Sequence, residues 1–202
     1  MRQARLRAPA EWGVSHYHVV SRVVNREFVL GDEEREQFVR FMRLYERLCG
    51  VRVLTYCVLS NHFHLLVEVP RRRERALTEH ELLVVVRRAY GGARARALKV
   101  ELHQTREMAG EAKAAELMES WAKRMWDISQ FMKTLKQRFT QWFNKKHKRK
   151  GTLWEERFRS SLVEGQERGG QALHMVAAYI DLNPIRAGVV EDPKDYRWSG
   201  YG

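Results

Sequence analysis

The alternation of hydrophobic and polar positions in the first part of the chain predicts a strand, a helix and a hairpin. The stretch His16–Val24 is dense in valine and aromatic residues, which favour a half-buried strand. From Asp32 to Gly50, apolar residues recur at spacings of three and four, so we expect a helix that Asp32 caps and the glycine ends. Two further strand-like runs, Val51–Leu59 and His62–Val69, are separated by residues that suit a tight turn, and they predict an antiparallel hairpin.

The pattern changes after Pro70, where charged and alanine-rich sequence predicts an inserted helical region over residues 71–120. Within it, Thr78 and Glu81 have the spacing of a capping box, and the glycine pair after Tyr90 is expected to end a helix. The later part of the insertion is poorly amphipathic, which is typical of a solvated arm.

The last part of the chain predicts two more helices and one strand. Apolar residues alternate spacings of four and three over Trp121–Trp142 without a break, which predicts one long helical seam. A strand around Arg157–Val163 and a helix over Gln171–Leu182 follow, and Pro184 is expected to stop this helix. The order of elements predicts an α+β fold, in which a four-stranded antiparallel sheet carries its helices on one face.

The balance of charge points to a polyanionic partner. The chain of 202 residues has 37 Lys and Arg against 25 Asp and Glu, a formal net charge of +12 and an isoelectric point near 10.0. Its length and its 44% of hydrophobic residues predict one domain, 1–202, with the insertion at 71–120. Two cysteines are too few for a disulfide scaffold. Because Met1–Ala10 lacks a signal-peptide pattern and no long apolar run follows, we expect a soluble, cytoplasmic protein without a membrane partner.

One segment of the chain carries positive charge without an acidic residue to offset it. Its cations are Lys133, Lys136, Arg138, Lys145, Lys146, Lys148, Arg149 and Lys150. Such runs are most often a solvated helix face, but those usually mix the two signs, so we favour contact with a phosphate backbone. Trp142, Phe143 and His147 in the same segment could stack on unpaired bases, although Trp142 fits the apolar seam and is better explained as core.

Two pairs of histidines have the spacing that brings imidazoles together on a strand. His62 and His64 are expected to point to one face of their strand, with Phe63 on the other. Two imidazoles can share a divalent cation and leave coordination positions open for a phosphate oxygen and water. A surface or half-buried pair is the more common meaning of this pattern. His16 and His18 have the same spacing, so the spacing does not choose between the pairs.

A tyrosine and an asparagine lie four residues apart at the end of the last predicted helix. Tyr179 and Asn183 would share a face, although Pro184 follows directly. Taken alone, they are better explained as an amphipathic core residue and a helix stop. A nearby cation changes this balance, because it favours a phenolate and neutralises the phosphate that the phenolate attacks.

Four segments together resemble a known family. In chain order they are YHVVSR, NHFHLLVEV, GTLWEERF and YIDLNPIRAG, and they resemble the single-tyrosine HUH transposases of the insertion-sequence 200-like kind, specifically the REP-associated tyrosine transposases. The resemblance spans most of the chain outside residues 71–120. It implies a ferredoxin-like antiparallel sheet. It also implies a metal-dependent endonuclease and strand transferase that acts on single-stranded DNA, including palindromes that fold as hairpins.

The resemblance also assigns roles to residues. His62 and His64 match the family's metal ligands, which implies that the histidine pair on the first strand does not bind the cation. Tyr179 matches the nucleophile and Asn183 the third ligand of a Mg²⁺ or Mn²⁺ ion. Attack by tyrosine implies a 5′-phosphotyrosine link and a free 3′-hydroxyl, and rejoining then needs no nucleotide cofactor. A single nucleophile is compatible with a homodimer or with successive rounds in one chain.

Several alternatives accompany this hypothesis. The predicted phosphate contacts are Lys133, Lys136, Arg138, Lys145 and Lys146 from their clustering, and Arg157 and Arg186 from the family-like segments. The last two arginines could equally form ion pairs with nearby acids. Phe139 stands where relatives often carry tyrosine, and a nucleophile lost there would leave the protein inactive, but this position falls on the apolar seam. A catalytically inactive DNA-binding protein and a water-using metal nuclease are the competing functions.

Overall fold

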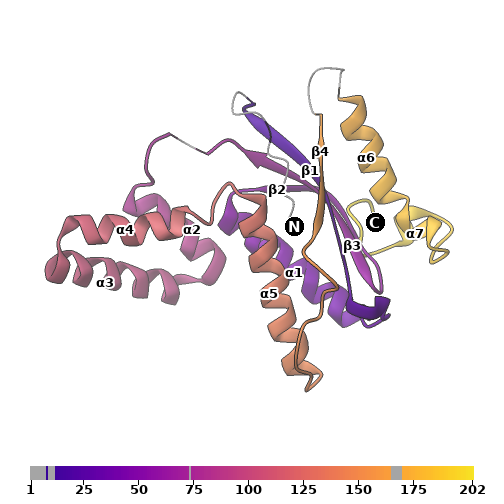
Figure 1. Cartoon of the computed structure of the whole chain (residues 1–202), viewed down its shortest axis with the longest axis horizontal. Helices are drawn as coiled ribbons and strands as arrows, with labels where there is room; N and C mark the ends of the chain where they lie inside the picture. Colours follow the sequence, from indigo (N-terminus) through magenta and orange to yellow (C-terminus); the bar gives the residue numbers. More distant parts are fainter. Residues whose placement is uncertain (1–7, 9–11, 73, 165–169) are drawn as a thin grey trace.

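A computed structural model gives the structure of residue 8 and of residues 12–72, 74–164 and 170–202 (Figure 1). Most of Met1–Ala10, on which the prediction about a signal peptide rests, lies outside these described residues. Within them, the elements in chain order are β1 (Val14–Arg22), η1 (Val24–Arg26), α1 (Asp32–Cys49), β2 (Arg52–Val58), β3 (His62–Pro70), α2 (Glu79–Tyr90), α3 (Gly92–Ala109), α4 (Glu111–Ala122), α5 (Ile128–Lys146), β4 (Arg159–Val163), α6 (Gln171–Asp181), α7 (Asn183–Arg186) and η2 (Pro193–Asp195).

The strands form one antiparallel sheet in the order β2-β3-β1-β4 (Figure 1). Strands β1 and β2 are joined through α1 and lie on either side of β3, as in ferredoxin-like folds. The expected α+β class with four antiparallel strands is confirmed. The pairing of β1 with β3 places Arg22 opposite His62 and Val20 opposite His64.

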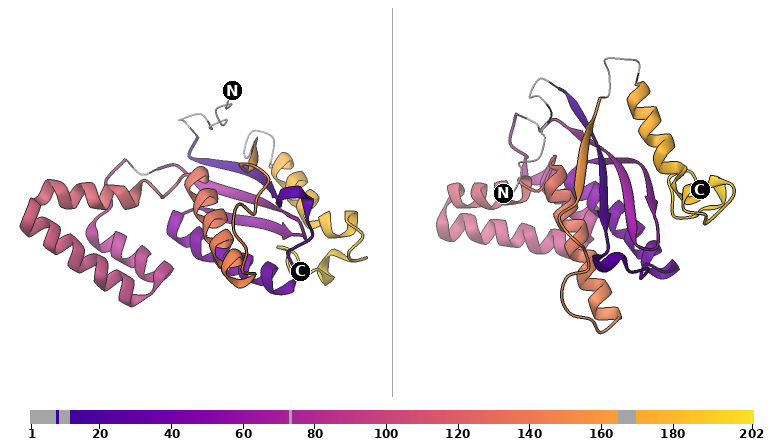
Figure 2. Two further views of the ribbon diagram at one scale, coloured as in Figure 1. Left: turned by 60° about the horizontal axis from the view of Figure 1, so that its bottom comes forward. Right: turned by 45° about the vertical axis from the view of Figure 1, so that its right-hand side comes forward.

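Helices cover both faces of the sheet. Helices α1 and α5 pack on one face and form the main core, in which Val19, Phe38 and Phe63 are fully buried. Helix α6 packs on the other face, where its Ile180 joins a smaller apolar cluster with Leu66 of β3 (Figure 2, right). The helices therefore do not all lie on one face, as the order of elements had predicted. The apolar stripe of α6 needs a partner surface, and alternate residues of β2 and β3 provide one.

The first helix has the predicted bounds, and its ends are set locally. Gly50 adopts φ 61°, a left-handed conformation that ends α1 and favours glycine. At the other end, Gly31 rather than Asp32 is the N-cap, and the Asp32 carboxylate accepts a hydrogen bond from Arg35 at 2.6 Å.

The apolar seam over Trp121–Trp142 is divided between two helices, so the prediction of one unbroken helical seam was wrong. Helix α5 has Asp127 as its N-cap, whose carboxylate accepts two backbone N–H groups of the first turn at 2.6 and 2.9 Å. The intervening turn preserves the apolar spacing, and the spacing alone therefore could not reveal the break.

The helices of the insertion pack against one another and extend to one side of the sheet (Figure 1). The capping box is present at the start of α2, where Thr78 and Glu81 exchange side-chain and backbone hydrogen bonds. Gly91, with φ 85°, ends this helix as expected. Leu98 and Leu102 of α3 are fully buried. The insertion is therefore a packed helical unit and not the solvated arm that its weak amphipathicity suggested.

Cys49 and Cys57 are both buried and form no disulfide with each other. None of the helices in the described ranges is long and apolar enough to cross a bilayer.

Candidate functional site

The sheet face beside α6 gathers imidazole side chains. His62 and His64 of β3 point to this face, whereas Phe63 between them is fully buried on the other face and packs on Phe38. The two imidazole rings lie 5.2 Å apart between centroids. The predicted convergence of this pair is therefore present.

The ring of His62 is held in one orientation by Asn61. Nδ1 of His62 lies 2.6 Å from Oδ1 of Asn61, and Nδ2 of Asn61 donates to the backbone carbonyl of Arg26 at 3.1 Å. Because the amide oxygen can only accept, Nδ1 of His62 carries the proton. Its Nε2 then presents a lone pair, as a metal ligand requires.

A third imidazole, which the family resemblance set aside, belongs to the same cluster. Nε2 of His18 on β1 lies 3.0 Å from Nδ1 of His64, and the two rings stack at 5.3 Å between centroids. His18 is opposite Leu66, so it reaches His64 diagonally across the strand pair. His16 instead contacts the Glu68 carboxylate at 3.5 Å. The register between β1 and β3 decides that His18, and not His16, lies beside His64. The spacing of the two histidines in the sequence could not predict this.

All three imidazoles of the cluster favour the neutral form. Burial lowers the pKa of His64 to about 3, with help from the two neighbouring imidazoles and Arg22. Burial also lowers the pKa of His18 and of His62, and Arg22 adds to the effect at His62. Neutral imidazole is the form that binds a metal ion, so the site does not have to displace protons at neutral pH.

Helix α6 is anchored to the sheet by the two residues that directly follow Tyr179. Ile180 is fully buried in the cluster that contains Leu66. The Thr55 hydroxyl on β2 donates to the Asp181 carboxylate at 2.5 Å, and burial raises the pKa of that carboxyl. These contacts hold the end of α6 against β2 and against β3, the strand that carries His62 and His64.

The phenol ring of Tyr179 meets the histidine cluster. Its centroid lies 5.8 Å from that of His64 and 5.9 Å from that of His18, with the rings edge to face. Tyr179 is 39% exposed, so a large substrate can reach it. The guanidinium of Arg186 lies 5.1 Å from the centre of the phenol ring and makes no ion pair within the described ranges. A phenol, imidazoles and a cation are thus brought together by one chain, and such a set can bind and attack a phosphodiester.

Asn183 lies one helical turn beyond Tyr179 and is buried. Its Nδ2 donates a hydrogen bond to the backbone carbonyl of Tyr179 at 2.7 Å, so the amide oxygen is the atom that could bind a cation. Within the described ranges, no three His, Cys, Asp or Glu side chains are grouped so that they could hold a metal ion. A cation here would depend on Nε2 of His62 and His64 together with an amide oxygen, a mixed set that suits Mn²⁺ better than Mg²⁺.

Phe139 is fully buried in the main core, with its ring 5.2 Å from Phe38 and 5.8 Å from Trp154. A side chain at this position has no access to DNA. Its burial therefore argues against a nucleophile there and favours Tyr179, which lies beside the imidazoles.

The cations that were predicted to contact DNA do not form one continuous patch. Lys133 and Arg157 line the same cavity beside α5, and within the described residues neither takes part in an ion pair. Lys136, which lines this cavity too, donates to the backbone carbonyl of Glu156 at 2.8 Å. Arg138 and Lys145 are exposed elsewhere on α5.

Lys146 is engaged by acids of α1. Its Nζ lies 2.7 Å from the Glu33 carboxylate and 2.5 Å from that of Glu34, which His147 also contacts at 3.1 Å. Burial alone would raise the pKa of Glu34, but the hydrogen bonds from Lys146 and His147 outweigh it and hold that pKa below its usual range. The cationic segment contains no acid of its own, but part of its charge is balanced by acids of α1.

Replacing Lys146 with alanine is expected to lower stability, whereas Lys145→Ala is not. The first change removes a partner from the buried carboxylate of Glu34, and the second removes an exposed side chain. Urea unfolding followed by circular dichroism should show a lower midpoint for Lys146→Ala only.

The pH dependence of this difference follows from Glu34. Because folding lowers the pKa of Glu34, its contribution is present above the ordinary glutamate pKa and is lost as the pH falls through the folded value. The gap between wild type and Lys146→Ala should therefore narrow in acid. Equal midpoints for both alanine variants at neutral pH would show that Lys146 has no such structural role.

Comparison with known proteins finds one family that part of the chain resembles and solved structures with a similar fold. Residues 13–77 match the family described as Transposase IS200 like. A REP-associated tyrosine transposase bound to a REP hairpin has a similar fold, with a TM-score of 0.58 and 14% identity over 98% of this chain and 83% of that chain. A candidate transposase from Deinococcus radiodurans R1 gives a TM-score of 0.40 and 14% identity over 90% of this chain and 96% of that chain. No curated protein matches the sequence.

The matched residues contain the first three strands and α1, and with them the three clustered histidines. Residues 13–77 are similar to the IS200-like transposase family, and the whole fold is similar to that of a REP-associated tyrosine transposase. Tyr179 and α6 lie beyond the residues that the family match covers.

Proposed function

We propose that this protein is a metal-dependent endonuclease and strand transferase for single-stranded DNA, with Tyr179 as its nucleophile. The observation that supports this most directly is the position of the phenol ring, 5.8 Å from His64 and 39% exposed. The match of residues 13–77 to IS200-like transposases supports DNA as the substrate. The solved relative is bound to a REP hairpin, which makes hairpin-forming DNA the first substrate to test.

In the proposed reaction, the phenol oxygen of Tyr179 attacks the phosphorus of a phosphodiester, and the bond from phosphorus to O3′ breaks. The products are a 5′-phosphotyrosine link and a 3′-hydroxyl, and the proton that the phenol loses is matched by the one that the 3′ oxygen gains. Because one ester replaces another, attack by a 3′-hydroxyl can reverse the step and join DNA ends without a nucleotide cofactor.

Other side chains of this protein would hold the cation, attract the phosphate and position the phenol. His62, His64 and Asn183 would hold Mg²⁺ or Mn²⁺, which supplies charge neutralisation at the attacked phosphate. Arg186, beside the phenol ring, attracts the phosphate to the nucleophile. The anchored end of α6 keeps the phenol close to the imidazoles. The nucleophile is therefore already positioned before DNA binds, which lowers the entropic cost of reaching the reacting geometry.

A covalent adduct tests this proposal. Hairpin DNA labelled at its 3′ end is incubated with the protein and Mn²⁺, denatured and separated on a gel, and the adduct is digested and mapped by mass spectrometry. We expect labelled protein whose modified peptide contains Tyr179. Cleavage without any adduct would indicate a water-using nuclease, and binding without cleavage would indicate a DNA-binding protein that has no turnover.

We further propose that His18 positions His64 for the cation. Two neutral imidazoles joined by one hydrogen bond need one donor, and only donation from Nδ1 of His64 leaves its Nε2 able to bind a metal ion. Nε2 of His18 is then the acceptor that selects this tautomer. Partners of this kind orient metal-binding histidines and raise their basicity.

His18→Phe is expected to weaken Mn²⁺ binding about 10- to 100-fold, because it keeps a ring in place but removes the acceptor. His18→Gln retains an acceptor oxygen and should restore part of the affinity. Binding is measured by electron paramagnetic resonance of free Mn²⁺ without DNA, so the readout does not depend on cleavage. If the two variants lose affinity equally while both keep the thermal stability of the wild type, the hydrogen bond does not position His64.

A further inference from the structure

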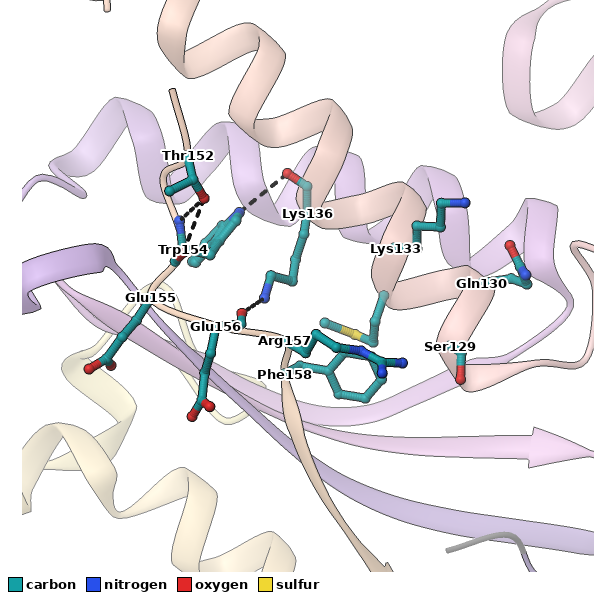
Figure 3. Close-up of a pocket in the computed structure, with 11 residues that line it drawn as sticks. Ser129, Gln130, Lys133, Lys136, Thr152, Trp154, Glu155, Glu156, Arg157 and Phe158 are labelled. Atoms are coloured by element: carbon teal, nitrogen blue, oxygen red, sulfur yellow. Dashed lines mark hydrogen bonds between the residues drawn. The ribbon is translucent and has the colours of Figure 1, made fainter. Parts of the chain in front are cut away.

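A cavity of about 610 Å³ lies between α5 and the segment that leads into β4 (Figure 3). Its walls include the largely buried side chains of Met132, Trp154 and Phe158. Lys133 and Arg157 are exposed at its rim. The volume lies within the range of small-ligand sites, about 300 to 1,000 Å³, so one nucleotide unit fits.

The charge around the cavity favours an anionic ligand. Glu155 and Glu156 also line it, but Figure 3 shows their carboxylates pointing away from α5. The Glu156 carboxylate contacts Arg159 at 2.7 Å. In the described part of the chain, Lys133 and Arg157 form no ion pair, so their charge is available to a phosphate.

A basic path joins this cavity to the histidine cluster. Arg157 also lines a neighbouring hollow of about 60 Å³, together with Arg22 and Arg159 and with the acids Glu155 and Glu156, so that three arginines face two carboxylates there. Arg22 is opposite His62 in the sheet and is close enough to lower the pKa of that histidine. A DNA backbone that leaves the cluster can therefore follow arginines around the edge of the sheet to the cavity.

We propose that this cavity binds one unpaired base of the DNA strand, with Lys133 and Arg157 on its flanking phosphates. The rings of Trp154 and Phe158 line the cavity and give it apolar surface for a base. A base within a duplex is stacked on both faces and paired along one edge, so it cannot enter the cavity. The cavity therefore selects single-stranded DNA. This inference rests on the proposed function, which places the reacting strand at the other end of the basic path.

Abasic scanning tests the cavity. Tyr179→Phe protein, which keeps the DNA uncleaved, is titrated with a hairpin that carries a single-stranded tail. The same DNA is then used with one abasic residue moved stepwise along the tail. We expect one position at which loss of the base weakens binding about tenfold. Ser129→Trp, which fills the cavity from the start of α5, should remove this penalty, whereas Lys145→Ala should weaken intact and abasic DNA by the same factor.

A second measurement keeps the test independent of the filled variant. Titration of the wild-type protein with deoxyadenosine 5′-monophosphate should shift the indole N–H resonance of Trp154, assigned with Trp154→Phe, and leave that of Trp121 in α4 unchanged. The proposal is overturned if no abasic position shows a penalty that Ser129→Trp removes, and equally if the nucleotide leaves Trp154 unmoved. A covalent adduct at Tyr179 with no base penalty rejects the cavity alone, and a base penalty without an adduct rejects the nucleophile alone.

Discussion

Tyr179→Phe is expected to abolish the covalent protein-DNA adduct and to slow strand cleavage by on the order of a thousandfold or more. The change removes one oxygen and leaves a ring of the same shape against His18, His64 and Arg186. DNA affinity and Mn²⁺ affinity should therefore stay close to those of the wild type. Single-turnover cleavage of the labelled hairpin, with the adduct quantified on denaturing gels, measures the loss.

Tyr201→Phe is the matched control for this change. Tyr201 is also exposed, at 62%, but it lies near the end of the chain outside the histidine cluster. The Tyr201→Phe variant should cleave the hairpin and form the adduct at the wild-type rate. An adduct that persists in Tyr179→Phe would move the nucleophile to another residue, and cleavage that persists without an adduct would make water the attacking group.

His64→Gln is expected to reduce Mn²⁺ affinity by roughly a hundredfold or more, and cleavage at limiting Mn²⁺ should fall with it. His64 is the centre of the imidazole cluster, because its ring contacts those of His18, His62 and Tyr179. Glutamine preserves polarity but removes the nitrogen that would bind the cation. Isothermal titration with Mn²⁺ in the absence of DNA measures the change directly.

His16→Gln separates a metal role from a general effect of histidine loss. His16 belongs to the other pair with the same spacing, but it contacts Glu68 and no ring of the cluster. Its loss should leave Mn²⁺ affinity and cleavage unchanged. If His16→Gln and His64→Gln weakened Mn²⁺ binding alike, the cation would not be held at the proposed position.

Local elements were predicted well because their determinants are close in sequence. The left-handed Gly50, the capping box of Thr78 and Glu81 and the turn between β2 and β3 all act within a few residues. The break between α4 and α5 was missed because the N-cap Asp127 interrupts a helix without changing the apolar spacing. Periodicity records which face is buried, but it does not record where the backbone turns.

Within the site, period-two alternation was sufficient to place His62 and His64 on one face of β3, since neighbouring side chains on a strand point to opposite sides. The inclusion of His18 required the register between β1 and β3, which joins residues 46 positions apart. The same limit applies to Lys146, whose acidic partners come from a helix more than a hundred residues earlier.

The sequence by itself determined the α+β order of elements, the alternating faces of the strands, the basic character of the chain and the segments that resemble the transposase family. Only the tertiary structure decided that the tyrosine of α6 meets the imidazoles, that His18 and not His16 supports them, and that a cavity opens beside α5. The reason is physical: propensity, capping and periodicity act over a few neighbouring residues, whereas a site is assembled by burying apolar faces from distant parts of the chain against one another.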